Sequence, residues 1–467
     1  MKSRKALFII FIIIFHLLFL IPVWSVKYIP LQDWPVFMGF SYIISHFSNF
    51  SSAFTVKPVS PPYLTGFLLL AGLMRIFPPL VAGKVLLSIY IISFFVSFYY
   101  YLKILNPKSI FLYFFAPLLV FNNFFAKGNI NFILSIPLFL FVFPFTIKRL
   151  NNYKWNNLLI VFLLSLLLYF THFFTYFVFI LFVLIINVVK KKGIPLFAVS
   201  LIPFFSFIAY FITNKSPVEI YFYHSFLQKF FSLRDLFGTW TPYWDVAIMF
   251  IPFILLVTFA FTGWKKAELE WKIIFFVLIL FYVISPTEVY TLMRPDQRFL
   301  TFVFFILFLI VKFVKRAKLQ YFFSAGMIFL SLLNIVRKEK VFIKLEPKIE
   351  SSIKAILLVP QDKAVVNLGT LKYYVGVINP FVNILAYNIL QNDNPFIPSY
   401  NWNVPISNTL WFPWPRIEEG EINNKAELIT HYNYFFVMEN DSTFENQLKD
   451  FTEPVYANGN VKLFKKK

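Results

Sequence analysis

The chain has 467 residues, of which 59% are hydrophobic and only 14% are charged, whereas a soluble protein carries roughly 25% charged residues. A water-soluble fold cannot bury this much apolar surface, so the composition predicts a polytopic α-helical membrane protein. Cysteine is absent, which excludes disulfides and thiolate chemistry. The net charge of +21 comes from short clusters between apolar runs, as in membrane proteins, and therefore does not indicate a nucleic-acid partner.

The first apolar run, residues 6–26, follows three cations within the first five residues. A cleaved signal peptide has this shape, but no small-x-small cleavage site follows, and the chain continues as Trp24-Ser-Val-Lys27. We therefore expect an uncleaved first span with the N-terminus in the cytoplasm.

Ten further crossings are expected after the first, which gives eleven. The single runs are residues 80–102, 109–125, 129–147, 195–213, 244–263, 272–287, 299–314 and 320–336. Residues 157–189 are about twice one crossing and have cations at both ends, so we expect a hairpin that turns near Thr171-His172. Prolines bracket residues 63–77, which favours a surface or re-entrant helix over a crossing.

Loop charges predict the orientation of these spans. Residues 1–336 carry 28 Lys+Arg and 8 Asp+Glu, and the eleven-span topology places 18 of these cations but only Glu268 and Glu270 inside. The cation bias follows the positive-inside rule and puts the C-terminus outside, across a plasma or cytoplasmic membrane. The long outer loops are then residues 27–79, 214–243 and 287–298.

Charges in these outer loops lie close to hydrocarbon, where they are costly and usually paired or functional. Asp33 is the only carboxylate of the first outer loop. It could cap the surface helix expected at residues 36–46, with Pro35 in its first turn. Arg294 and Arg298 could reach lipid headgroups as interfacial anchors. His172, at the hairpin turn, could be a packed polar residue or part of a pocket.

The composition changes near residue 337. The remaining residues carry 15 Lys+Arg and 14 Asp+Glu, a nearly balanced set that predicts an extracytoplasmic α/β domain over residues 337–467. We expect strands at residues 364–368 and 434–438, a helix at 442–451, and a hairpin at 455–464 that turns at Asn458-Gly459. Residues 392–414 are rich in Asn, Pro and Trp, and we expect an irregular segment that could lean over the membrane face.

The segments that combine with this layout are Gln32-Asp33-Trp34-Pro35, Pro61-Pro62, Asn129-Ile-Asn131, Pro137-Leu138, Thr171-His172 and Arg294-Pro-Asp-Gln-Arg298. Together with the inside N-terminus, the early outer acid, the surface helices and the small outer domain, they resemble the GT-C superfamily of polyprenyl-phosphate-sugar glycosyltransferases. That class contains protein O-mannosyltransferases and aminoarabinose lipid A transferases. The resemblance covers most of the chain through its layout more than through its motifs.

The resemblance implies a membrane enzyme that moves a sugar from a polyprenyl-phosphate donor to an extracytoplasmic lipid, glycan or protein. Family members use the first-loop acid as a catalytic base or as a metal ligand, so it implies one of these roles for Asp33, with a divalent cation in the second case. It also implies cationic groups at the donor phosphate. Those groups would be Arg294 and Arg298 first and Lys229 and Arg234 second, with His172, Asp296 and Glu288 in the same pocket.

The second outer loop departs from the family pattern. Many members carry another acid there, but residues 122–129 contain none. A two-carboxylate metal site therefore lacks support, and an inactive relative or another way of activating the acceptor stays open.

Two other function classes remain open. A transporter or flippase of a lipid-linked substrate would carry ionisable residues near mid-membrane and broken, repeated helices. The charges of this chain instead crowd the outer face. A non-catalytic envelope assembly factor would act through the tail. Membrane lipid is a partner in every case, and the sequence identifies no protein partner.

Overall fold

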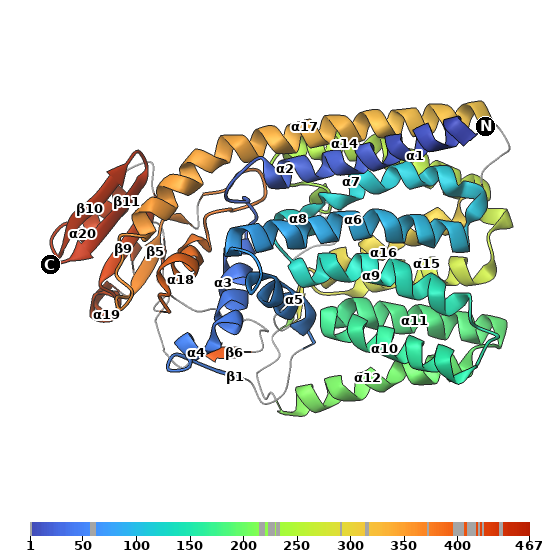
Figure 1. Ribbon diagram of the computed structural model, residues 1–467, viewed down its shortest axis with the longest axis horizontal. Coiled ribbons are helices and arrows are strands. Elements are labelled where there is room, and N and C mark those ends of the chain that lie inside the picture. The colour runs from blue at the N-terminus through green and yellow to red at the C-terminus, as the bar shows by residue number, and fades with distance from the viewer. Residues whose placement is uncertain are drawn as a thin grey trace.

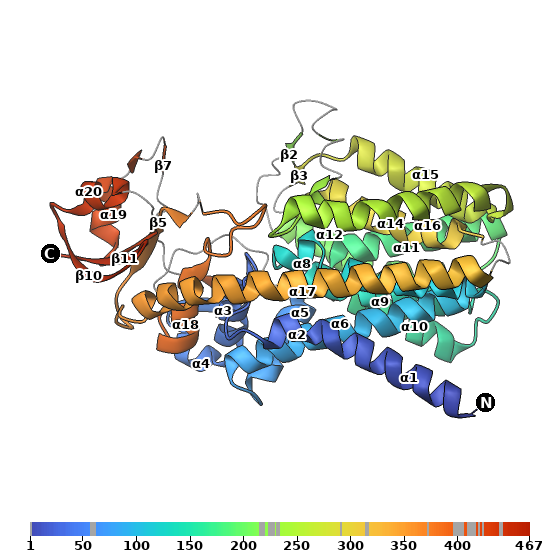
Figure 2. The same ribbon diagram turned by 90° about the horizontal axis from the view of Figure 1, so that it is seen from above.

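The computed structural model describes residues 2–56, 62–213, 220–222, 229, 234–289, 292–312, 317–370, 373–395, 406–408, 417–418, 421–422, 425–438 and 442–467. An elongated bundle of roughly parallel and antiparallel helices forms most of the molecule, and a small sheet with short helices lies at one end (Figures 1 and 2). The N-terminus lies at the far end of the bundle from that sheet.

Helices are present at every apolar run that predicted one. In chain order they are α1 (Lys2–Leu17), η1 (Leu18–Leu20), α2 (Ile21–Trp24), α6 (Pro79–Leu105), η2 (Pro107–Phe115), α7 (Ala116–Val120), α8 (Asn123–Ala126), α9 (Ile130–Ile147), α10 (Trp155–Thr171), α11 (Phe173–Lys190), α12 (Ile194–Thr213), α14 (Pro242–Gly263), η3 (Trp264–Lys266), α15 (Leu269–Ile284), α16 (Pro295–Ile310) and α17 (Ala317–Ile356). The break between α10 and α11 confirms the predicted hairpin near Thr171-His172.

Six helical stretches of the described chain are long and apolar enough to cross a membrane, as expected for a membrane-embedded protein. They are Pro79–Leu105, Pro107–Ala126, Ile130–Ile147, Phe173–Lys190, Pro242–Lys266 and Lys318–Ile356. Other helices at predicted runs are shorter: α10, α15 and α16 have 17, 16 and 16 residues, whereas a crossing needs about 20. Length and composition therefore support six crossings, fewer than the eleven expected.

Three short helices lie within residues 27–79: α3 (Trp34–Ser45), α4 (Phe47–Phe50) and α5 (Leu64–Met74). They lie at the end of the bundle that faces the small sheet (Figure 1). The expected surface helix at residues 63–77 is α5, an 11-residue helix that packs on α3. Strand β1 (Phe54–Val56) pairs with β6 (Ile406–Asn408), so the tail does reach back to this outer segment.

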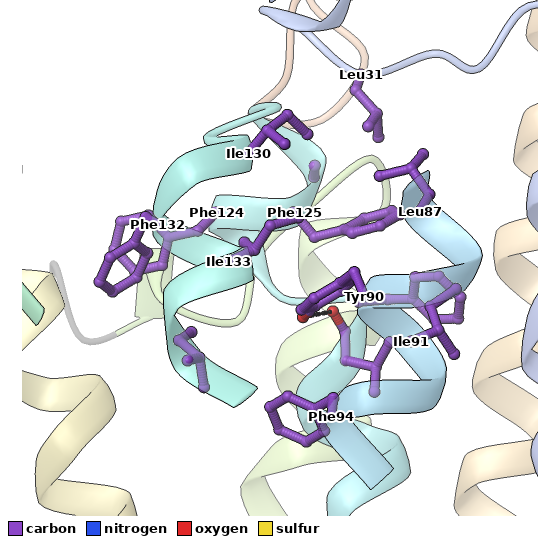
Figure 3. Packing of buried hydrophobic residues seen from close by; sticks show 14 of the residues in the cluster. Leu31, Leu87, Tyr90, Ile91, Phe94, Phe124, Phe125, Ile130, Phe132 and Ile133 are labelled. Atoms are coloured by element: carbon purple, nitrogen blue, oxygen red, sulfur yellow. Dashed lines mark hydrogen bonds between the residues drawn. The ribbon is translucent and has the colours of Figure 1, made fainter. Parts of the chain in front are cut away.

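Aromatic side chains fill the core beneath these helices. Figure 3 shows the packing between α6, α8 and α9, where the Tyr90 ring stacks on Phe125. The Tyr90 hydroxyl donates a hydrogen bond to the carbonyl oxygen of Val120 at 3.0 Å. This bond satisfies a buried hydroxyl and an α7 carbonyl together, and it ties α6 to the segment that leads into α8.

The C-terminal region is built on a four-stranded sheet in the order β10-β11-β9-β5. Strand β5 (Val365–Leu368) pairs in parallel with β9 (Tyr434–Met438), and β10 (Thr452–Asn458) and β11 (Val461–Lys466) complete the sheet with antiparallel pairs. The remaining elements are η5 (Ile384–Ala386), α18 (Tyr387–Asn392), β7 (Ile417–Glu418), β8 (Glu421–Ile422), α19 (Lys425–His431) and α20 (Thr443–Leu448). These strands and α20 agree with the predicted positions to within a few residues.

Two boundaries differ from the prediction. The expected domain boundary at 336/337 falls inside α17, which continues unbroken to Ile356. A helix satisfies its backbone hydrogen bonds internally, so it can leave lipid for water without ending, and the change in composition marks only the change of solvent. In the final hairpin Asn458 still pairs with Val461, so the turn lies at Gly459-Asn460, with Gly459 at φ +57°.

Candidate functional site

Asp33 is held by the backbone of residues 126–127, at the end of α8. The Asp33 N–H donates to the Lys127 carbonyl oxygen at 3.0 Å, and the Gln32 N–H donates to the Ala126 carbonyl oxygen at 3.1 Å. Gly128 makes this approach feasible: its φ is +73°, and a Cβ at this position would lie 2.9 Å from the Trp34 nitrogen. These hydrogen bonds therefore hold residues 32–33 against residues 126–127.

The carboxylate of Asp33 does not cap the helix that it precedes. Asp33 occupies the N-cap position of α3, but its side chain accepts no capping hydrogen bond. It accepts instead from Asn383 Nδ2, at 3.0 Å from Oδ1. The capping role is thus not realised, and the carboxylate is available for another one.

The partner Asn383 comes from the C-terminal region, 350 residues away in sequence. The same amide nitrogen also donates to the Gln32 carbonyl oxygen at 3.3 Å, and the Asn379 N–H donates to Gln32 Oε1 at 3.2 Å. The sequence did not indicate Asn383, because a single asparagine that belongs to no motif carries no local signal. The C-terminal region is therefore part of the wall around Asp33.

Burial and charge set opposing demands on this acid. Burial raises the pKa of Asp33 to about 7, although the positive charge of Lys127 and the hydrogen bonds from Gln32 and Asn383 act to lower it. Burial likewise lowers the pKa of Lys127 to about 8, assisted by Arg294, whereas Asp33 and Asp235 act in the other direction. Both groups therefore titrate close to neutral pH.

Lys127 is a candidate site residue that the sequence did not single out. The loop at 122–129 has no acid, and its single lysine belongs to no motif. Lys127 is in electrostatic reach of Asp33, Asp235, Arg294 and Arg298, so it lies at the centre of a cluster of charges. The clue in the sequence was a lone lysine between two apolar helices on the side where the acids collect.

Arg294 links two acids at the edge of this cluster. Its Nη1 lies 3.9 Å from an Asp235 carboxylate oxygen, and its Nε lies 3.5 Å from Asp296 Oδ1. Asp296 is fully buried, whereas the side chain of Arg234 is 60% exposed and meets Asp235 at 3.4 Å. Of the expected arginines, Arg294 therefore contacts the buried Asp296, whereas the exposed Arg234 contacts Asp235.

Arg298 is buried rather than directed to a lipid surface. It is 5% exposed, and its guanidinium carbon lies 4.7 Å from the centre of the Phe132 ring. Its Nη1 donates to His172 Nε2 at 2.6 Å, which requires the neutral His172 tautomer with its proton on Nδ1. Burial, with the Arg298 charge second, holds the pKa of His172 well below its usual range. The packed arrangement brings Arg298 and His172 together and does not fit an interfacial anchor.

Lys229 and Glu288 lie near the segment that joins α15 to α16, and Lys229 is in electrostatic reach of Asp296 and Arg294. The Lys229 ammonium donates to the Val283 carbonyl oxygen at 2.8 Å and to that of Ser285, so it caps the C-terminal end of α15. Glu288 lies in β3 (Glu288–Val289), half-buried, in a small sheet with β2 (Ile220–Tyr221) and β4 (Leu292–Met293). Both remain predictions as members of a substrate pocket.

A divalent cation fits poorly at Asp33. Within the described ranges, no three His, Asp or Glu side chains come together as metal ligands. The charged group that acts on Asp33 is a cation, Lys127, which would repel a metal ion. The donor set therefore does not support a metal ion here, and no chemical step below depends on one.

An apolar pocket lies within the helical bundle, and one of its lining residues, Asn122, stands at the start of α8. Asn122, whose side chain caps α8, lines the cavity, while Lys127, just past the helix end, holds Asp33. The other lining residues are Phe94, Leu118, Leu119, Phe121, Ile136, Leu236, Phe237, Asp245, Ile248, Met249, Thr301, Phe304, Phe305, Asn334 and Lys338. Most of the wall is aromatic and aliphatic, which suits a hydrocarbon chain.

One rim of the cavity carries a buried ion pair. Lys338 Nζ and Asp245 Oδ1 are 2.6 Å apart, with side chains that are 1% and 4% exposed. Asp245 also accepts from the backbone and hydroxyl of Thr239, at 3.0 and 2.5 Å, and from those of Thr241, at 3.3 and 3.1 Å. The pair therefore fastens residues 239–241 onto α17.

No family model, curated protein or solved structure matches this chain. The function is accordingly argued from the geometry of the site.

Proposed function

We propose that this protein is a membrane glycosyltransferase of the GT-C type that moves a sugar from a polyprenyl-phosphate donor to an extracytoplasmic acceptor. The observation that carries the proposal is the pairing of a carboxylate that titrates near neutral pH, Asp33, with a cluster of cations beside an apolar cavity. A base, cationic groups for the donor phosphate and an apolar pocket for the start of the lipid chain are three parts that such a transfer requires.

The proposed step needs one proton acceptor. The acceptor hydroxyl oxygen attacks the anomeric carbon of the donor sugar, and its proton passes to the Asp33 carboxylate. The bond between the anomeric carbon and the phosphate oxygen breaks, and the lipid phosphate leaves with the electron pair. Lys127, Arg294 and Arg298 would stabilise the negative charge that develops on that phosphate.

The cavity beside α8 would hold the first part of the lipid chain. The course of the chain supports this assignment, since Asn122 in the pocket wall and Lys127, whose carbonyl oxygen accepts from Asp33, stand at the two ends of the short helix α8. A donor that entered from the bilayer could keep its tail among Phe304, Phe305 and their neighbours with its phosphate near Lys127.

The proposal includes the orientation and number of crossings expected from the sequence. Eleven crossings would leave the N-terminus inside and the Asp33 cluster at the outer face. The crossings beyond the six long apolar helices would be made by shorter helices such as α10, α15 and α16.

Donor binding tests the proposal directly. Purified protein in nanodiscs should bind undecaprenyl-phosphate hexose in native mass spectrometry, and free undecaprenyl phosphate should compete. A deletion strain should lack one sugar on a lipid, glycan or protein, which would name the acceptor. Failure of every polyprenyl-phosphate sugar to bind would remove the glycosyltransferase proposal.

One observation favours the second candidate, a transporter or flippase of a lipid-linked substrate. The Asp245–Lys338 pair is an ionisable pair buried in the wall of a cavity within the helical bundle, where transporters place such groups. Transport would move labelled lipid-linked sugar across proteoliposomes without any change in its chemical structure, whereas the transferase would release polyprenyl phosphate.

A further inference from the structure

In the described part of the chain, the side-chain amide of Asn383 makes hydrogen bonds through its nitrogen but not through its oxygen. Asn383 is 6% exposed, and its nitrogen donates to Asp33 Oδ1 and to the Gln32 carbonyl oxygen. Its oxygen, Oδ1, is buried and has no hydrogen-bond partner in the part of the chain that the structure describes. A buried acceptor without a donor is costly, so such a group in a native fold calls for a ligand or a water molecule.

The position of this unpaired oxygen is informative. Nδ2 and Oδ1 belong to one planar amide, so an amide that turns its nitrogen to Asp33 presents its oxygen beside the carboxylate. Two hydrogen-bond acceptors, Asp33 Oδ1 and Asn383 Oδ1, are therefore separated by no more than one hydrogen bond and the width of one amide group. Two adjacent acceptors are complemented by two adjacent donors.

We propose that Asn383 positions the acceptor substrate and that this acceptor is a polyol, such as a sugar, with neighbouring hydroxyl groups. The hydroxyl that attacks the donor gives its proton to Asp33, while the adjacent hydroxyl keeps its proton and donates it to Asn383 Oδ1. The inference rests on the proposed function and specifies the acceptor class for the same site.

A purely structural role would make Asn383 a fastener between the C-terminal region and the bundle. Other contacts already provide that link: Gln391 Nε2 donates to the Tyr28 hydroxyl at 3.3 Å, and the Tyr28 and Tyr387 rings meet edge to face. These contacts do not touch Asp33. Gln391→Ala therefore removes a comparable link between the same two regions and is the matched control.

A charged residue faces Asp33 from the end of α8 but none faces it from residues 379–392. This residue is Lys127, and Asp235, Arg294 and Arg298 act on Lys127 in turn. Residues 379–392, which bring Asn383 against Asp33, contain no charged residue. From this side only hydrogen bonding adjusts the acid, so a substitution at Asn383 changes the titration of Asp33 without removing a charge.

The first experiment needs no substrate. Dicyclohexylcarbodiimide modifies protonated carboxyl groups in apolar surroundings, and mass spectrometry of the full-length protein reports labelling of Asp33, with Asp33→Asn as background. In wild type, labelling should fall as pH rises through about 7, the raised pKa of Asp33. Asn383→Ala should remain labelled at higher pH, because the N–H that favours the charged carboxylate is gone. Asn383→Asp, which keeps the side-chain size, should move the profile the same way.

The second experiment measures transfer from undecaprenyl-phosphate hexose to two probes. Octyl glucoside offers neighbouring hydroxyls, and N-acetylserine amide offers a single one. Wild type should transfer sugar to octyl glucoside in preference to the serine probe. Asn383→Ala should raise the KM for octyl glucoside by about 10–100-fold, the loss expected for one hydrogen bond to a buried acceptor. Its donor dissociation constant should stay unchanged, and Gln391→Ala should behave like wild type in both experiments.

Each contrary result has a distinct meaning. Unchanged labelling and unchanged KM in Asn383→Ala would overturn the role of Asn383. Equal transfer to the serine probe, or donor binding without transfer to octyl glucoside, would overturn the polyol acceptor. Wild type that binds no donor would overturn the proposed function together with the polyol acceptor, while the labelling profile would still decide whether Asn383 adjusts Asp33.

Discussion

The backbone N–H of Asp33 donates to the carbonyl oxygen of Lys127 at 3.0 Å, which holds the first-loop acid and the second-loop cation side by side. Burial raises the pKa of Asp33 to about 7 and lowers the pKa of Lys127 to about 8, so the two values lie close together. Because the contact is made through the backbone, it depends on the shape of the loop after α8 more than on either side chain.

Gly128 should therefore be intolerant of a side chain. Gly128→Ala places a Cβ at positive φ and within 3.0 Å of the Asp33 nitrogen, so the acid must move away from Lys127. We expect transfer to fall by about 10²-fold, the effect of displacing a reacting group by roughly 1 Å. Gly326→Ala in α17, where a Cβ meets nothing within 4 Å, is the control and should leave turnover unchanged. Normal turnover in Gly128→Ala would show that catalysis does not depend on the backbone contact between Asp33 and Lys127.

Replacement of Asp33 by Asn keeps the shape of the side chain and removes the base. Purified Asp33→Asn should bind donor lipid as wild type does, while turnover falls by about 10²–10⁴-fold. Steady-state transfer and native mass spectrometry measure the two quantities separately. Wild-type turnover in this variant, with a confirmed donor, would remove the catalytic assignment of Asp33.

The pH profile of the wild type should be bell-shaped. The active form of Asp33 is the carboxylate, so turnover should rise with pH through about 7. Donor binding by Lys127 requires its ammonium form, so affinity should fall as pH rises through about 8. In Lys127→Arg the alkaline limb should move to higher pH, because guanidinium stays charged. An acid limb near the ordinary pKa of aspartate would contradict the burial argument.

Arg298 should contribute to donor binding more than Arg234 does. Arg298→Ala removes a buried guanidinium next to His172, whereas Arg234→Ala removes a largely exposed one beside Asp235. We expect donor affinity to fall by about 10–100-fold for Arg298→Ala and by less than about threefold for Arg234→Ala. Arg298→Lys, which keeps the charge, controls for loss of folding and should bind donor better than the alanine variant. Equal effects of the two alanine variants would argue against a phosphate site at Arg298.

The Asp245–Lys338 pair should be important for stability. Lys338→Met leaves Asp245 buried without its cation, which costs about 3–5 kcal/mol of unfolding free energy for pairs of this kind. The double variant Asp245→Asn with Lys338→Met should recover a large part of that loss, because no buried charge remains. Thermal unfolding followed by tryptophan fluorescence gives the comparison. A double variant that is as unstable as the single one would mean that the ionic contact is not what holds α17 to residues 239–241.

Topology can be tested with reporter fusions. Because the cations of residues 1–336 gather in the predicted inner loops, alkaline phosphatase fused after Lys467 should be active and a fusion after Lys192 inactive. A cytoplasmic reporter such as green fluorescent protein should give the opposite pattern. Activity after Lys192 alone would invert the orientation and place the Asp33 cluster on the cytoplasmic side.

Several properties of this protein follow from the sequence alone. Long apolar runs predict helices because lipid forces backbone hydrogen bonds to close within the segment, and the helices lie at those runs. Strands β5 and β9 were readable for a related reason, since short continuous apolar segments in a polar region must be buried. Asp33 was singled out because a lone acid beside hydrocarbon is costly. These signals are local and depend on a few neighbouring residues.

The tertiary structure decided what surrounds Asp33. Lys127 stands at the end of α8, Arg298 lies in α16 and Asn383 lies in the C-terminal region, so no spacing in the sequence relates them. The continuation of α17 through residue 337 is likewise not encoded in composition, which reports the solvent around a segment but not where its hydrogen bonding ends. The buried pair of Asp245 and Lys338 and the unpaired oxygen of Asn383 are consequences of packing. They arise because burial removes water from polar groups, and only the folded arrangement determines which of those groups find partners.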